Sequence, residues 1–503
     1  MKPIFKKLLL CVLSLALIAG LAFGGVYLWQ IQPQPIYKGD FNENIPYEKY
    51  IKPQELPEDE PVFNVHDYAV DGQKDWTKAI NEAIKYAGVS GGGIVLLEGG
   101  EFLSGTVNLR DNITLWIAPD ASLIASTQFR DFDGSLIKAE GCENIRITGG
   151  GTINGQGEYF VKRPKEQPRL EPFEVTDIRG LTTEYYARIR MGRLGRPNSM
   201  VWLRNCDNLL VDNIILYNSM HWTLKIVLSE NVEVRNVVVN SNLHVANTDG
   251  IDIVGSQNVL VEHCFISTAD DGIVIKNKKE KNPKPVKNVL IRDCEIQTCV
   301  NAFKIGTETY TEISDVRVEN IRASLPGLYP GSVSGMSIIS MDGAYVHDIT
   351  IDGFYMEGVT CPLFVRLGDR NRWRDQKGMG RLENITVKNV SAVDAELPML
   401  ISGVTSKGKT QYVKNVNLSN FDIIYRDNQE YIELRDEIPE LARDYPENWR
   451  FLDVPAYGLW ARHIDGLTLE NIKVTPRSVN TREMFSLNDD VLNLNNFVQE
   501  AVK

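Results

Sequence analysis

The stretch NVLV at Asn258–Val261 shows the pattern that decides the fold, an asparagine followed by apolar residues at alternate positions. Runs of the same form, NVEV and NVLI, begin at Asn231 and Asn288. Related runs begin at Asn112, Asn144, Asn208, Asp315, Asp348, Asn384, Asn415 and Gly466. From Asn208 to Asn415 the successive offsets are 23, 27, 30, 27, 33, 36 and 31 residues, which is the period range of stacked supersecondary units.

This repetition predicts an all-β fold, a parallel β-helix. Each repeat carries short alternating strands with Gly and Asn at the corners and almost no helix signal, so stacked coils would bury one continuous core. A β-propeller is the structural rival, but its blades would need hairpin turns and longer repeats. We expect the repeated asparagines to turn the chain and to bond along a ladder between coils.

One amphipathic helix is expected near the start of this body. The segment 75–87 has Asp75 as a plausible N-cap, Gly88 as a stop, and one apolar face made of Trp76, Ala79, Ile80, Ala83 and Ile84. Such a helix would cap the open N-terminal edge of the β-helix, because an exposed sheet edge needs protection.

The N-terminus predicts export. Lys2, Lys6 and Lys7 precede an uncharged apolar stretch of 22 residues, 8–29, and about twenty apolar residues can span a bilayer. We favour an uncleaved membrane anchor over a cleaved signal peptide, with the body periplasmic or extracellular. The expected organisation is a leader at 1–30, a linker at 31–60, a β-helix domain at 61–480 and a tail at 481–503.

Composition excludes several classes of protein. The chain of 503 residues has 66 acidic and 54 basic residues, a net charge of −12, and so lacks the basic character typical of nucleic-acid binding. Seven cysteines without a CxxC pair indicate neither zinc nor a disulfide scaffold, and most are expected to be small core residues. No nucleotide loop or haem motif is visible, so no cofactor and no metal is expected. The oligomeric state stays open.

Three carboxylates interrupt two of the predicted strands. NTDGIDI at 247–253 contains Asp249, and TADDGIVIK at 268–276 contains Asp270 and Asp271. Aligning the two segments as neighbouring strands places Asp249 level with Asp270, roughly 5 Å apart. Crowded carboxylates titrate unequally, so one stays protonated while another remains a base, which is what glycoside hydrolysis needs. A calcium site or solvated turn acids would explain the same residues.

Several motifs together resemble glycoside hydrolase family 28, the polygalacturonase family, over most of residues 61 to about 476. They are NTDG, DDG, GGGTINGQG at 149–157, the opening segment from Asp75, and RPNSMVWLRNCDNLLVDN at 196–213. The resemblance implies a right-handed parallel β-helix that hydrolyses pectin with inversion. It also implies that Asp270 is the general acid, and that Asp249 and Asp271 hold and activate water.

The chain departs from the family at the substrate-binding positions. Asn301 stands where the family has a histidine, and Lys304 stands near the family's serine. Ser337 and Ile339 replace the arginine and lysine that hold the substrate's carboxylate. The predicted substrate-binding residues are therefore Asn247, His244, Asn301, Lys304, Arg366 and Arg370, with His221 and Trp373 as further candidates.

The sequence leaves three functions open. The first is an exported hydrolase of a pectic polysaccharide or oligosaccharide, for which long loops such as 158–197 and 426–455 would favour end-acting cleavage. The second is a polysaccharide lyase on the same fold, which would need calcium ligands and an Arg or Lys base. The third is a non-catalytic carbohydrate-binding surface protein that kept the scaffold.

Overall fold

The computed structural model describes residues 41–162, 192–193, 195–243, 245–325, 332–373, 378–426, 437–451, 454–477 and 482–495. The predicted leader lies outside them. None of the described helices combines the length and apolar character needed to cross a membrane.

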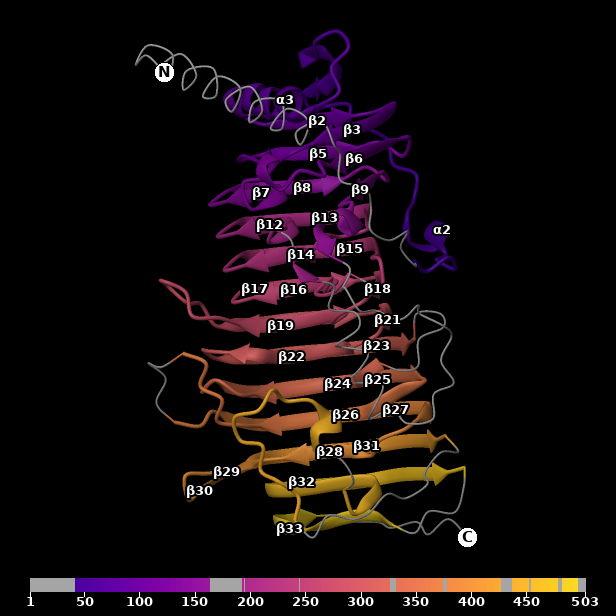
Figure 1. Cartoon of the computed structure of the whole chain (residues 1–503), viewed down its shortest axis with the longest axis vertical. Coiled ribbons are helices and arrows are strands. Elements are labelled where there is room, and N and C mark those ends of the chain that lie inside the picture. The colour runs from indigo at the N-terminus through magenta and orange to yellow at the C-terminus, as the bar shows by residue number, and fades with distance from the viewer. Residues whose placement is uncertain are drawn as a thin grey trace, which may run out of the picture.

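The described chain winds into stacked coils whose strands pair in parallel, forming one long sheet that wraps around a single core (Figure 1). The predicted parallel β-helix is confirmed. Its core is one continuous apolar cluster that runs from Val65 to Phe485. Six of the seven cysteines are described; all six are buried, and no disulfide joins any of the described residues.

The coils present three faces. The aspartate face is the one whose strands follow the corners that carry Asp249, Asp270 and Asp271. Its strands are β4 (Val107–Asn108), β7 (Ser135–Glu140), β12 (Ser199–Arg204), β14 (Trp222–Val227), β16 (Ile251–Val254), β19 (Ile273–Asn277), β22 (Asn301–Thr309), β24 (Ser332–Ser340), β26 (Val359–Leu367), β28 (Met399–Ser402) and the first part of β32 (Ala456–Pro476).

The ladder face carries the repeated asparagines. Its strands are β1 (Val62–Asn64), β2 (Gly93–Leu97), β5 (Ile113–Ile117), β8 (Glu143–Thr148), β13 (Asp207–Tyr217), β15 (Glu230–Asn240), β17 (Gln257–Glu262), β20 (Val286–Arg292), β23 (Ile313–Ser324), β25 (Tyr345–Glu357), β27 (Arg381–Ala395), β31 (Val413–Tyr425) and the end of β32.

The third face continues from the ladder face. Its separate strands are β3 (Gly100–Ser104), β6 (Ala121–Ala125), β9 (Thr152–Asn154), β18 (Phe265–Thr268) and β21 (Glu295–Thr298). In other coils one strand bends across both faces, as β13 does at Asn213, whose φ is 49°. Two short pairs stand apart from the sheet, β10 (Val161–Lys162) with β11 (Gly192–Arg193) and β29 (Val404–Ser406) with β30 (Lys409–Gln411).

The predicted asparagine ladder is confirmed. The Nδ2 of Asn258 donates to the Oδ1 of Asn231 at 3.1 Å, and the Nδ2 of Asn288 donates to the Oδ1 of Asn258 at 2.9 Å. All three residues have φ between 53° and 55°, the left-handed region that Asn tolerates better than most residues. Each asparagine therefore turns its own coil and binds the next one.

Helices are few. The predicted capping helix is α3 (Thr77–Val89), which packs against β2 at the N-terminal end of the stack, with the Oδ1 of Asp75 accepting from the amide of Thr77 at 2.8 Å. The other described helices are α2 (Tyr47–Tyr50) and the 3₁₀ turns η1 (Val65–Tyr68), η2 (Phe129–Asp131), η3 (Gly157–Phe160) and η4 (Asn448–Phe451).

Two predicted domain boundaries are wrong. The β-helix does not end at 480, because β33 (Glu483–Asn495) pairs with β32 and adds a further strand. Part of the predicted linker also belongs to the packed body, since Tyr50 is buried against Phe265 on the flank of the coils. The Oδ1 of Asn213 further accepts from the amide of Lys52 at 2.7 Å. Neither segment carries the repeat pattern, which explains why both were placed outside the domain.

Candidate active site

The three aspartates lie at the corners that precede β16 and β19. As predicted, Ile251 pairs with Ile273 and Ile253 with Ile275. That register places Asp249 level with Asp271, so the expected alignment of Asp249 with Asp270 is wrong by one residue. Asp270 is the additional residue at its corner, where its Oδ1 accepts from the amide of Asp271 at 2.9 Å.

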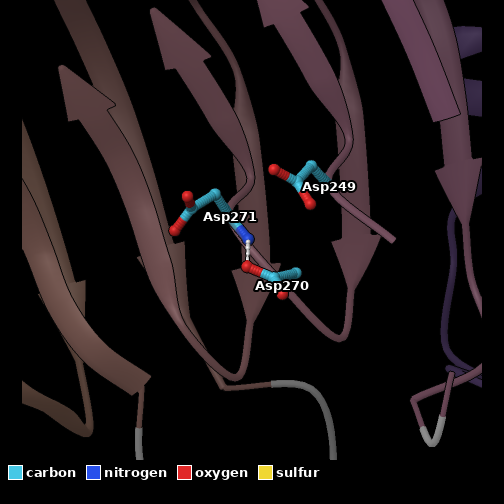
Figure 2. Close-up of side chains that lie close together, drawn as sticks. All are labelled: Asp249, Asp270 and Asp271. Carbon is cyan, nitrogen blue, oxygen red and sulfur yellow. Dashed lines mark hydrogen bonds between the residues drawn. The ribbon is translucent and has the colours of Figure 1, made fainter. Parts of the chain in front are cut away.

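These carboxylates form one compact cluster. Asp249 lies on one coil, and Asp270 and Asp271 lie on the next (Figure 2). One oxygen from each acid lies within 4.8 Å of the others. Only 2% of Asp249 and 3% of Asp271 is exposed. Such burial excludes the interpretation of these residues as solvated turn acids.

Asp249 is paired with a buried ammonium group. The Nζ of Lys276 lies 2.6 Å from the Oδ2 of Asp249 and 2.6 Å from the Oδ1 of Asp252. Lys276 is 4% exposed, so its charge is satisfied by these carboxylates more than by solvent. The Oδ1 of Asp249 is buried and has no hydrogen-bond partner among the described residues, which leaves one acceptor for a water molecule.

Asp271 has its own buried cation. The Nζ of Lys304 lies 3.1 Å from its Oδ2, and the Nδ2 of Asn301 donates to its Oδ1 at 2.7 Å. The Oγ of Ser337 in turn donates to the Oδ1 of Asn301 at 3.0 Å, which fixes the orientation of that amide. Asn301 and Lys304, both predicted from the sequence, are thus brought together with the acids.

Among the described residues, no ammonium group bonds to Asp270. Its Oδ2 accepts from the Nδ2 of Asn247 at 3.3 Å, and the Oδ1 of Asn247 accepts from Arg196 at 3.0 Å. Burial, together with the negative charges of Asp249 and Asp271, raises the pKa of Asp270 well above its usual range, against the opposing charge of Lys304. The proton of the cluster therefore belongs on Asp270.

Burial also raises the pKa of Asp249, but Lys276 opposes that rise through its charge and its hydrogen bond. The paired Asp252 shows the same balance, with its pKa raised to about 8 by burial against Lys276. Because Lys276 contacts both acids directly, we assign the carboxylate form to Asp249.

Other predicted substrate-binding residues lie elsewhere or outside the described chain. Arg366 is 1% exposed, and its Nη1 donates to the Oγ of Ser402 at 2.7 Å and to the carbonyl of Gly403 at 2.6 Å. Arg370 pairs with Asp342. Both arginines are held by the fold, so we do not assign them to the cluster. His244 lies outside the described residues.

The two remaining candidates have structural contacts. The Nδ1 of His221 accepts from the amide of Trp222 at 2.7 Å. Trp373 packs edge-on against Tyr310, with ring centroids 5.2 Å apart.

Some residues of the site are absent from the candidates predicted by the sequence. Lys276 and Asp252 alternate with inward-facing isoleucines in GIVIK and GIDI, so strand periodicity already places both on the aspartate face. Glu447 has no such signal, since it comes from a long insert. It is 5% exposed, and burial, together with the negative charge of Asp271, raises its pKa to about 7, against the opposing charge of Lys304.

The cluster could also hold a cation in principle, because three carboxylates within 4.8 Å offer the oxygen ligands that calcium uses. However, Lys276 and Lys304 already place two ammonium groups on Asp249 and Asp271. A divalent ion would have to be accommodated against both charges, so we assign no metal to the cluster.

A parallel β-helix with three clustered aspartates defines a class of carbohydrate-active proteins, and comparison identifies the family. Residues 97–390 match the model of Glycosyl hydrolases family 28. A probable polygalacturonase of Vitis vinifera is 26% identical over 67% of this chain and 69% of its own length.

Two solved exopolygalacturonases share the fold. The structure from Thermotoga maritima has a TM-score of 0.61 at 22% identity and covers 85% of this chain and 94% of its own. The structure from Yersinia enterocolitica has a TM-score of 0.64 at 20% identity and covers 88% and 78%. The family match spans more than half of the sequence, so the chain belongs to glycosyl hydrolases family 28 and is a hydrolase of O-glycosyl bonds.

Proposed function

We propose that this protein hydrolyses a glycosidic bond in a pectic polysaccharide or oligosaccharide, with inversion, using Asp270 as general acid and Asp249 and Asp271 to activate water. One observation carries the proposal. Lys276 pairs with Asp249 and Lys304 with Asp271, whereas the described donors to the Asp270 carboxyl group, the Asn247 amide and the backbone amide of Asp271, are neutral.

This unequal pairing separates the roles that the chemistry needs. An adjacent ammonium group favours the ionised form of a carboxylate, so Asp249 and Asp271 stay negative and can accept hydrogen bonds from the attacking water. Asp270, beside two negative charges, keeps its proton until the glycosidic oxygen leaves. The proton then passes to that oxygen, water adds to the anomeric carbon, and the water's own proton goes to the carboxylates.

The spacing of the acids bears on the stereochemistry. Oxygens within 4.8 Å are closer than the roughly 6.5–9.5 Å that separates the two acids of most inverting enzymes, and nearer to the about 5–5.5 Å of retaining ones. Three acids share this space instead of two, and the unpartnered Oδ1 of Asp249 offers a place for water. We therefore propose direct attack by water, and the anomeric form of the first product tests that proposal.

Relatives support the substrate class. Curated relatives include a polygalacturonase of Ralstonia solanacearum and an exopolygalacturonase of Zea mays, which the chain matches over 55% and 64% of their lengths. We propose a pectic substrate on that basis, with end-acting cleavage as the mode favoured by the long inserts. We also propose that the body is exported and anchored by residues 8–29, because of the lysines and the apolar stretch at the N-terminus.

The deciding experiment incubates the protein with a panel of pectic oligosaccharides and analyses the products. Saturated products, the first formed with inverted anomeric configuration, support the proposal. Unsaturated product ends would identify a lyase, and retained configuration would contradict the assigned roles. Binding without any cleavage would favour the non-catalytic alternative.

A further inference from the structure

A second group of charges lies beside the aspartates, and only its Lys276 has a part in the proposed acid and base steps. We call it the lysine–tryptophan cluster, which consists of Trp222, Lys225, Lys276 and Lys278. The three Nζ atoms lie 4.8, 3.8 and 3.9 Å from the ring centroid of Trp222. Lys276 belongs to both groups, so the cluster directly adjoins Asp249.

Two of these lysines, Lys225 and Lys278, have no carboxylate partner within the described ranges. The acids whose charges act on them are each paired with another cation: Asp252 with Lys276, Glu280 with Arg204, and Glu308 with Arg372. Among the described residues, neither Lys225 nor Lys278 has an acidic oxygen within the 4.0 Å of an ion pair. Both ammonium groups instead lie over the indole ring of Trp222, which attracts a cation without neutralising it.

Holding these three positive charges together is unfavourable. Burial lowers the pKa of Lys278 to about 8, and the positive charges of Lys276 and Lys225 add to that effect against the opposing charge of Glu308. Burial also lowers the pKa of Lys225. An arriving anion would relieve this repulsion and would be attracted more strongly than in water, because the groups are partly desolvated.

We infer that Lys225 and Lys278 bind the carboxylate group of an acidic sugar unit, held beside Asp249 on the side of β14. The inference rests on the proposed function for the nature of the ligand, a uronic acid within an oligosaccharide. The ammonium groups supply charge-assisted hydrogen bonds to the carboxylate.

The opposite side of the aspartates differs. There β24 carries Ser337 and Ile339, which are uncharged and buried, and Lys304 is already paired with Asp271. An acidic sugar is therefore recognised on the β14 side, and the unit on the β24 side does not need a carboxylate. This asymmetry points to a bond that joins an acidic sugar to a neutral one.

The test measures binding in an Asp270→Asn background, in which no turnover consumes the ligand. The probes are trigalacturonate and its fully methyl-esterified form, which keeps the sugar rings and removes the charges. We expect trigalacturonate to bind more tightly than the ester. Lys225→Gln and Lys278→Gln should each weaken trigalacturonate binding by about 10- to 100-fold, as loss of a charged hydrogen bond does, with little effect on the ester.

Two controls separate charge from folding. Lys278→Arg keeps the charge and should retain most of the affinity. Lys473→Gln removes a lysine that is half-exposed and pairs with Asp422 away from this cluster, and it should change nothing. Equal binding of the two probes, or unchanged affinity in both glutamine variants, would overturn the inference.

The same measurements keep this inference apart from the proposed function. A wild-type protein that cleaves no pectic oligosaccharide can still bind trigalacturonate in a way that depends on the lysines. That result would support the carboxylate-binding inference and contradict the proposed hydrolase function. Cleavage that requires Asp270 but does not change when Lys225 and Lys278 are substituted would support the proposed function and contradict the carboxylate-binding inference.

Discussion

The ladder face and the aspartate face use the polar residues at their turns in opposite ways. On the ladder face, Asn231, Asn258 and Asn288 are exposed and bind one another, since an amide both donates and accepts. At the aspartate corners the side chains are acids that only accept when ionised, and two of them are almost completely buried. The amides of the ladder satisfy one another's hydrogen bonds, whereas the clustered carboxylates need cations from neighbouring strands to balance their charge.

The difference separates corners that stabilise the fold from the aspartate corners, to which we assign catalysis in the proposed function. Lys276 and Lys304 reach the acids from β19 and β22, so the charge balance of the site depends on the stacking of several coils. Substitutions on the two faces should therefore have separable effects on activity and stability.

The largest effect is expected for Asp270→Asn. The change removes the transferable proton and keeps the shape, so cleavage of a substrate with a poor leaving group should slow by about 10²- to 10⁴-fold. Because no lysine in the described part of the chain bonds to Asp270, the free energy of unfolding should change little. Steady-state kinetics and urea unfolding measure the two quantities, and full activity in the variant would remove Asp270 from the mechanism.

Lys276→Met should lower both the rate of cleavage and the free energy of unfolding. It leaves Asp249 and Asp252 buried without their shared cation, and breaking a buried ion pair destabilises a protein by about 3–5 kcal/mol. Activity should fall as well, since Asp249 would then tend to take up a proton. Lys473→Met is the matched control, because its partner Asp422 is half-exposed and such pairs contribute about 0–1 kcal/mol. If the two variants have equal free energies of unfolding, the pairing of Lys276 with Asp249 and Asp252 does not stabilise the fold as expected.

The pH dependence of binding should distinguish the lysine–tryptophan cluster from an ordinary surface lysine. Lys278 faces Lys225, Lys276, Glu308 and Asp252, and its pKa is lowered to about 8, so it is charged below that pH and neutral above it. Affinity for trigalacturonate in the Asp270→Asn background should therefore fall as pH rises through about 8. In Lys278→Arg the decline should disappear, because a guanidinium group stays charged. A decline that persists in this variant would assign the titration to another group.

Much of the fold follows from local sequence because the repeat is local. Each coil has its own asparagine turn and alternating strand, so the register that pairs Ile251 with Ile273 is readable from the sequence. The last strand, β33, lacks that pattern, and its place depends on pairing with β32.

The site was predictable in part. The three aspartates, Asn301 and Lys304 stand in motifs, and alternation alone places Lys276 and Asp252 on the same face. Glu447 and the arrangement of Trp222 with Lys278 could not be predicted, because they depend on contacts between residues far apart in the chain. Arg366 shows the converse: the sequence predicts it to bind substrate, whereas it lies in β26, buried against backbone carbonyl groups.

The smallest effect is expected on the ladder face, from Asn258→Ala. The substitution removes the amide that joins Asn231 to Asn288 and places a β-carbon at φ 53° without the local hydrogen bonds that make Asn tolerable there. Together these losses should lower the free energy of unfolding by about 1–2 kcal/mol and leave activity unchanged. Asn258→Gly separates the two causes, because glycine adopts a positive φ without strain but also lacks the amide. If the glycine variant is as stable as the wild type, the turn conformation matters and the ladder bonds do not; if it is as unstable as the alanine variant, the amide ladder itself holds the coils together.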